Sequence, residues 1–115
     1  MALAHAQPLD VISVRPLAAG IAQTKTHSLL KTDRLQLMRL VLMAGQTVPE
    51  HQVPGELTLL CVEGRVLVNT PGRQCCLTEG ELVLLPADEP HALEAQANSS
   101  LLVTLLLHQD TAAAG

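Results

Sequence analysis

Residues 63–80 read EGRVLVNTPGRQCCLTEG, and the turn signals in this stretch decide the fold class. The breaks at Gly64, Pro71 and Gly80 enclose two short runs, and glycine or proline at such intervals marks turns. A helix of average length, about 11 residues, does not fit between breaks this close together. We therefore predict strands at residues 65–69 and 73–78.

The same punctuation continues in both directions along the chain. Further short apolar runs predict strands at 34–43, 56–62, 81–85, 90–95 and 100–108. Residues 44–55 must include turns because two glycines and two prolines interrupt them, and residues 21–30 are compatible with an edge strand. Short strands in close succession predict an all-β fold, an antiparallel sandwich or barrel.

The length of the chain limits its organisation. A chain of 115 residues is long enough for one domain with one hydrophobic core. We expect a single domain over residues 1–115, with an N-terminal arm at 1–20, a barrel spanning approximately 21–108 and a frayed tail at 109–115.

The composition argues against several classes of function. The chain contains 23 Leu and no Phe, Tyr or Trp, so its core is aliphatic and no aromatic platform exists for single-stranded nucleic acid. A formal net charge of −4 argues further against a nucleic-acid partner. No apolar run reaches the roughly 18 residues of a transmembrane helix. We therefore expect no membrane span. No basic residue precedes Arg15, so we also expect no secretory signal.

The cysteines and the apolar strands add two expectations. Cys61, Cys75 and Cys76 form an odd set that fits a reducing compartment, so we predict a cytoplasmic protein with buried thiols. Cys75 and Cys76 are adjacent in a predicted strand and cannot both line one site. Strands such as 57–62 and 101–107 are apolar on both faces and need cover on both sides. We expect the N-terminal segment or a second subunit to provide it, and predict a homodimer.

Two longer stretches carry a family resemblance. Residues 45–64 read GQTVPEHQVPGELTLLCVEG, and residues 80–95 read GELVLLPADEPHALEA. They resemble the two motifs of the cupin superfamily, G-(five)-H-x-H-(three or four)-E-(six)-G and G-(five)-P-x-G-(two)-H-(three)-N. The resemblance implies a small single-domain cupin, an antiparallel double-stranded β-helix or jelly-roll barrel.

The resemblance also implies which residues form the site. In cupins the metal is held by two histidines and a glutamate of the first motif and a histidine of the second. His51 and His91 match two of these four positions, whereas Val53 and Leu57 occupy the other two. Glu56 is one residue from the glutamate position, and an offset of one in a strand turns a side chain to the opposite face. Asp88 stands at a glycine position, which Asp tolerates, because it is one of the few residues that adopt left-handed turns.

Two functions of different class remain open. The first is a small-molecule-binding or sensor module, whose apolar ligand contacts His51, His91, Val53 and Leu57 and which needs no cofactor. The second is a metal-dependent enzyme, a dioxygenase, isomerase or lyase, with a divalent metal held by His51 and His91. The resemblance disfavours a sugar-nucleotide epimerase, because that branch needs a tyrosine and the chain has none. Alternatively, the two imidazoles are partly buried and satisfied by backbone groups or by each other.

Other polar residues have weaker assignments. Glu50 and Glu56 could supply polarity to the pocket, but a charge at a strand end is more commonly solvated. His5 and His108 lie near the ends of the chain and are expected to be exposed, while the sequence does not place His27.

Overall fold

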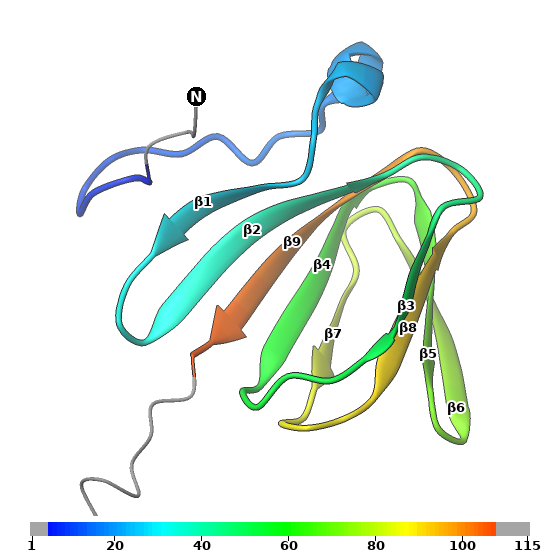
Figure 1. Cartoon of the computed structure of the whole chain (residues 1–115). Helices are drawn as coiled ribbons and strands as arrows, with labels where there is room; N and C mark the ends of the chain where they lie inside the picture. The colour runs from blue at the N-terminus through cyan, green and yellow to red at the C-terminus, as the bar shows by residue number, and fades with distance from the viewer. Residues whose placement is uncertain (1–4, 108–115) are drawn as a thin grey trace, which may run out of the picture.

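The structure is a computed structural model that describes residues 5–107 (Figure 1). Within this range the chain forms one 3-10 helix and nine strands: η1 (Ala18–Gln23), β1 (His27–Lys31), β2 (Leu35–Leu42), β3 (Thr47–His51), β4 (Leu57–Glu63), β5 (Arg65–Thr70), β6 (Arg73–Thr78), β7 (Leu82–Leu85), β8 (His91–Ala95) and β9 (Ser99–Leu106). The fold is all-β, as the turn punctuation predicts.

The strands form two antiparallel sheets that face each other in a jelly-roll arrangement. One sheet has the order β1-β2-β9-β4-β7 and the other β3-β8-β5-β6. Figure 1 shows the two layers side by side. The sheet that begins with β1 is on the left, and the sheet that ends with β6 is on the right. The strand predicted at residues 73–78 coincides with β6, and most of the other predicted strands agree with the observed ones to within two residues.

Two segments differ from the sequence-based expectation. Residues 44–55 include turns at both ends, as expected, but they also contain a strand, β3, with Pro49 within it. Proline is tolerated there because β3 is at the edge of its sheet and needs to donate no ladder hydrogen bond on its free side. Residues 21–30 are only partly extended, since η1 ends at Gln23 and β1 begins at His27.

The core between the sheets is aliphatic. Its buried members come from the inner faces of both sheets: Leu42, Leu57, Leu59, Cys61, Val66, Val68, Leu77, Leu85, Leu93, Ala95 and Leu101. On β4 the alternate residues Leu57, Leu59 and Cys61 are buried, as the period of two requires for a strand with one inner face. With no aromatic ring available, leucine and valine side chains fill the space between the layers.

The N-terminal arm crosses the outer face of the five-stranded sheet and is held there by charged groups. The Glu63 carboxylate accepts hydrogen bonds from the main-chain N–H groups of Leu17 (2.7 Å) and Ala18 (2.9 Å) and from the Ser100 hydroxyl. Arg39 is 3% exposed on this face, and its guanidinium donates to the Ser100 hydroxyl and to the Ser13 carbonyl, both at 3.4 Å. The network satisfies a buried charge and fixes the arm.

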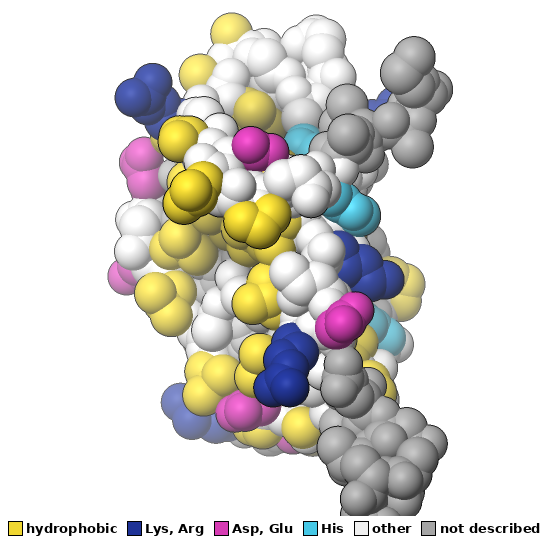
Figure 2. All heavy atoms as spheres, turned by 90° about the vertical axis from the view of Figure 1, so that its left-hand side faces the viewer, with side chains coloured by type: hydrophobic (Ala, Val, Ile, Leu, Met, Phe, Trp, Pro, Cys, Tyr) yellow, Lys and Arg dark blue, Asp and Glu magenta, His cyan; other side chains and the backbone are white. Residues whose placement is uncertain are grey.

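The arm covers only part of the outer face. Leu82 and Leu84 on the edge strand β7 remain 62% and 55% exposed. Figure 2 views the molecule from the side of the five-stranded sheet and shows hydrophobic side chains across the middle of this face. None of the helical segments within residues 5–107 is long and apolar enough to span a membrane.

Candidate functional site

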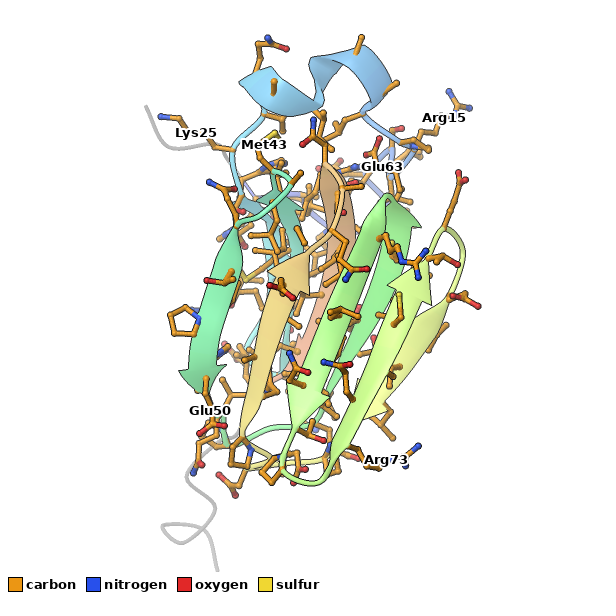
Figure 3. The ribbon with its side chains drawn as sticks, turned by 90° about the vertical axis from the view of Figure 1, so that its right-hand side faces the viewer. Arg15, Lys25, Met43, Glu50, Glu63 and Arg73 are labelled. Carbon is orange, nitrogen blue, oxygen red and sulfur yellow. The ribbon has the colours of Figure 1, made fainter. Side chains whose placement is uncertain are left out.

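A cavity of about 210 Å³ lies between the two sheets at one end of the barrel. Two histidines and nine aliphatic side chains line it: Met38, Leu40, Val48, His51, Val53, Leu57, Leu59, His91, Leu93, Val103 and Leu105. The structure therefore brings together all four residues that the resemblance singles out, His51, His91, Val53 and Leu57. Glu50, next to His51, lies at the end of the barrel opposite η1 (Figure 3).

A β-bulge turns His51 toward the cavity. In the pairing of β3 with β8, Val48 lies opposite Leu93 and His51 opposite His91, so three residues advance on β3 against two on β8. Side chains an odd number of positions apart point to opposite faces of a regular strand, and the extra residue of a bulge corrects this. Val48 and His51 can thus both line the cavity. His91 begins β8, whereas His51 ends β3.

The two imidazoles are oriented by the same kind of hydrogen bond. Nδ1 of His51 is 3.1 Å from the Pro49 carbonyl oxygen, and Nδ1 of His91 is 2.9 Å from the Glu89 carbonyl oxygen. A carbonyl only accepts, so each Nδ1 carries a proton, and in the neutral form of each ring the lone pair is on Nε2. Neither Nε2 has a hydrogen-bond partner among residues 5–107. The ring centroids are 4.3 Å apart and the planes are tilted by 57°.

The carboxylates near the histidines face away from them. Glu50 and Glu56 are exposed and do not line the cavity, whereas Leu57, one position after Glu56, is buried in it. This is the outcome expected for neighbours on a strand.

The loop before β8 contains a left-handed residue at the position where the motif has glycine. Asp88 has φ +61°, which agrees with the expectation that aspartate tolerates a left-handed turn at this position. Its N–H donates to the Val53 carbonyl oxygen at 2.8 Å, which ties the loop before His91 to the segment after His51.

The donors around the cavity are too few for a divalent metal centre made of protein ligands alone. Structural and catalytic sites for such ions commonly use three or four protein ligands, and His51 and His91 supply two nitrogens. Val53 and Leu57, at the other two positions, are apolar. No group of three or more His, Cys, Asp or Glu within residues 5–107 is placed to hold a metal ion. The side chains present do not fit a complete cupin metal centre.

The remaining histidines lie outside the cavity. His5 is exposed, as expected, and Nε2 of its ring is 2.8 Å from the Ser28 hydroxyl. His27 lies on β1, and its Nδ1 is 2.7 Å from the Lys25 carbonyl oxygen. His108 and the tail at 109–115 lie outside the described residues.

The three cysteines are free thiols in different surroundings. Cys61 is buried in the core, and burial raises the pKa of its thiol to about 11 despite a hydrogen bond to the Glu63 carbonyl oxygen. Cys75 and Cys76 are partly exposed neighbours on β6. Cys75 lines a second cavity and Cys76 does not, which agrees with the prediction that they cannot share a site.

Sequence reasoning missed much of the cavity and its surroundings. Two strands that lie outside both motifs, β2 and β9, complete the cavity. They contribute Met38, Leu40, Val103 and Leu105. Their alternation within apolar runs was visible in the sequence, but strand pairing decides which alternate set faces inward. Arg39 contacts Ser100, which is 61 positions away in the sequence. The only sign of this contact in the sequence is a charged residue inside an apolar strand.

Comparisons with known proteins agree with this geometry. Residues 38–107 match the family model described as Cupin domain, which covers more than half of the chain. No curated protein matches.

Solved structures with the same fold cover from three quarters to nearly all of the chain. A conserved protein of unknown function from Streptococcus pyogenes has a TM-score of 0.75 at 20% identity, covering 95% of this chain and 99% of that one. A cupin superfamily protein from Desulfitobacterium hafniense has a TM-score of 0.76 at 21% identity, covering 91% and 100%. KdgF from Halomonas sp. has a TM-score of 0.67 at 19% identity, covering 76% and 81%. At these identities the likeness shows the fold alone. The family match, together with the two motifs and the jelly-roll of facing sheets, shows that the chain belongs to the cupin domain family.

Proposed function

We propose that the cavity between the sheets binds a small, largely apolar organic molecule through one polar group. The observation that carries this proposal is the lining itself, nine aliphatic side chains and two histidines whose Nε2 atoms have no partner among residues 5–107. Binding pockets are commonly apolar with a few polar groups that orient the ligand. At about 210 Å³ the cavity suits a molecule smaller than a drug, such as a short-chain alcohol or acid.

The histidines define what the polar group must be. Because each Nδ1 already donates to a carbonyl, a neutral His51 or His91 offers a hydrogen-bond acceptor at Nε2. A hydroxyl or a protonated carboxyl group of the ligand can donate to it. When a ring is protonated, Nε2 becomes a donor, and a carboxylate of the ligand is then the matching partner.

A titration with simple probes tests this proposal. Protein with isotope-labelled methyl groups is titrated with 1-hexanol and with hexanoate, and the methyl signals of Leu59, Leu93 and Val103 are followed by NMR. His51→Leu and His91→Leu each remove one polar partner and should weaken binding roughly fivefold to tenfold. His27→Leu, on β1 outside the cavity, is the matched control. Unchanged cavity methyl signals with every probe would contradict the proposal.

A metal-dependent enzyme is the second candidate, and one observation favours it. A histidine that ligates a metal commonly donates its other ring nitrogen to a carbonyl or carboxylate, as both His51 and His91 do here. Further ligands would then have to come from water or substrate. Elemental analysis of untagged protein separates the two candidates. Stoichiometric metal that is lost in His51→Ala and in His91→Ala would favour the enzyme, and metal-free protein would favour the binding module.

We also propose that the protein is a homodimer, formed through the uncovered part of the five-stranded sheet. Leu60 pairs with Leu82 in register, and Leu82 and Leu84 leave an apolar surface at the edge of the sheet. An uncharged patch can face its own copy across a twofold axis without like-charge repulsion. A cytoplasmic location stays a prediction, supported by the three free thiols.

A further inference from the structure

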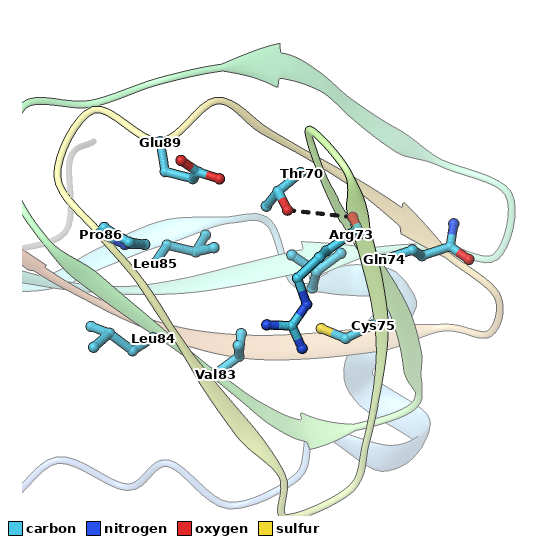
Figure 4. A pocket seen from close by; sticks show the side chains of 10 residues that line it. Thr70, Arg73, Gln74, Cys75, Val83, Leu84, Leu85, Pro86 and Glu89 are labelled. Atoms are coloured by element: carbon cyan, nitrogen blue, oxygen red, sulfur yellow. Dashed lines mark hydrogen bonds between the residues drawn. The ribbon is translucent and has the colours of Figure 1, made fainter.

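A second cavity lies between the β5–β6 hairpin and the edge strand β7. It has a volume of about 290 Å³ and shares no lining residue with the histidine cavity. Val68, Val83 and Leu85 provide apolar walls, and Figure 4 shows charged side chains approaching from two directions. The two cavities are neighbours in the space between the sheets, because Val68 and Leu85 are the strand partners of Leu93 and Leu57 in the first cavity and directly paired residues point to the same face.

The position of Arg73 follows from strand pairing. Val68 lies opposite Cys75 and Thr70 opposite Arg73, so these residues alternate along the same inner face as the buried Val66 and Val68. Arg73 thus begins β6 with its side chain on the cavity side. Figure 4 shows its guanidinium extending toward Val83, beside Cys75.

A carboxylate faces the cavity from the opposite wall. Glu89 belongs to the loop between β7 and β8 and is half-buried. Neither the Arg73 guanidinium nor the Glu89 carboxylate forms an ion pair or side-chain hydrogen bond within residues 5–107. Two opposite charges therefore border one apolar cavity without neutralising each other.

We propose that this second cavity binds a small zwitterion, an amino acid with an apolar side chain. The planar guanidinium of Arg73 suits a carboxylate, which it can bind with two parallel hydrogen bonds. Glu89 pairs with the ammonium group, and Val68, Val83 and Leu85 receive the side chain. A simple carboxylic acid fits less well, because Glu89 repels a second negative charge.

The cysteines provide a reporter for this site. Cys75 lines the second cavity, and its neighbour Cys76 points to the other face of β6. Cys61 is fully buried, and its pKa of about 11 keeps it protonated, so it does not react at neutral pH. Alkylation by iodoacetamide, resolved by peptide mass spectrometry, therefore measures access to the cavity at Cys75, with Cys76 as an internal control.

The experiment compares three probes that differ in one charge each. L-leucine carries both charges, leucinamide lacks the carboxylate and 4-methylpentanoate lacks the ammonium group. L-leucine should slow alkylation of Cys75 without affecting Cys76, and each of the other probes should need roughly tenfold higher concentration for the same protection.

Two variants identify the charges that act. Arg73→Gln should abolish the preference for L-leucine over leucinamide, and Glu89→Gln the preference for L-leucine over 4-methylpentanoate. An inward-pointing charge on an edge strand can also serve only to prevent aggregation. In that case Arg73→Gln would increase aggregation, and none of the probes would protect Cys75 in the wild type. That result would overturn the proposal and leave the proposed function of the histidine cavity untouched.

Discussion

His51 and His91 are direct partners across the β3–β8 ladder, and their imidazole centroids lie 4.3 Å apart. Forty positions of sequence separate them, and the bulge in β3 turns His51 to the same side as His91. The remaining positions of the motif, Val53 and Leu57, border the same cavity with apolar side chains. The barrel thus brings all four motif positions around one cavity, with histidine at two of them and hydrocarbon at the other two.

Restoring the missing donors should create a metal site. In the double variant Val53→His, Leu57→Glu, two further ligands enter the cavity that His51 and His91 already line. Four ligands instead of two should raise the affinity for Co²⁺ or Ni²⁺ by at least roughly a hundredfold, since loss of supporting groups at metal sites commonly costs tenfold to a hundredfold. Isothermal titration calorimetry measures the affinity.

In the control variant, the added histidine is placed at a position whose side chain lies outside the cavity. Gln52 is exposed and does not line the cavity, so the variant Gln52→His, Leu57→Glu should gain little affinity. Equal affinity in the two double variants, both folded by circular dichroism, would show that the faces of residues 52 and 53 are assigned wrongly.

Glu63 should make stability depend on acid pH. Partial burial raises the pKa of its carboxyl group. Hydrogen bonds from Ser100, Leu17 and Ala18, together with the positive charge of Arg39, lower this pKa by a larger amount. The pKa of Glu63 therefore lies below its ordinary value of 4.5. Because the folded pKa is depressed, the contribution of the ionised group is present above pH 4.5 and is lost as pH falls through the folded value.

The variant Glu63→Gln measures this contribution. At pH 7 it should lower the free energy of unfolding by about 1 kcal/mol, a modest value because the group is only partly buried. The loss should shrink in urea unfolding at a pH well below 4.5. Glu94→Gln, at an exposed position on β8, is the control. An equal loss at both pH values would mean that shape, not charge, holds the arm.

The strands were predictable where turn residues mark both ends. Gly72 and Gly80 have positive φ and bracket β6, whose bounds match the predicted 73–78. β3 was not predicted, because a proline within a short polar stretch carries the signals of a turn. Only its place at a sheet edge makes Pro49 acceptable, and edge position depends on pairing between distant strands.

The candidate site was also predictable only in part, because motif spacing is visible in the sequence and strand order is not. The motif spacing identified His51, His91, Val53 and Leu57, and the structure places all four around one cavity. The second cavity and the Arg39–Glu63 network could not be read from the sequence. Arg73 and Glu89, or Arg39 and Ser100, come together only after the order of strands in each sheet is known.

Gly64, which ends the first motif, should resist substitution for two separable reasons. Its φ is +93°, and a Cβ there would lie 2.5 Å from the Asn98 carbonyl oxygen and 2.6 Å from the Ser99 Cα. Gly72 also has a positive φ, +81°, but has no atom within 4 Å of the added Cβ. Gly72→Ala should therefore cost about 1–2 kcal/mol from backbone strain alone. Gly64→Ala should cost about 1–3 kcal/mol more from the clash.

Urea unfolding of the two alanine variants, compared with wild type, checks this difference. If both variants are destabilised equally, the turn between β4 and β5 relaxes away from β9 more easily than its hydrogen bonds suggest. Those bonds include Arg65 N–H to the Ser99 hydroxyl at 3.0 Å, and the Ser99 side chain is fully buried.

The apolar edge of the five-stranded sheet should carry the dimer. Leu84 is 55% exposed on β7, and a charge placed there would be buried in the proposed interface without a partner. The expected cost is about 3 kcal/mol, or roughly a hundredfold in the dimer Kd. Light scattering coupled to size exclusion should show a dimer for the wild type at micromolar concentration and a monomer for Leu84→Glu. Val11→Glu, at a 98% exposed position of the arm, should remain dimeric. A wild-type monomer would contradict the proposed dimer, and a dimeric Leu84→Glu would exclude this face as its interface.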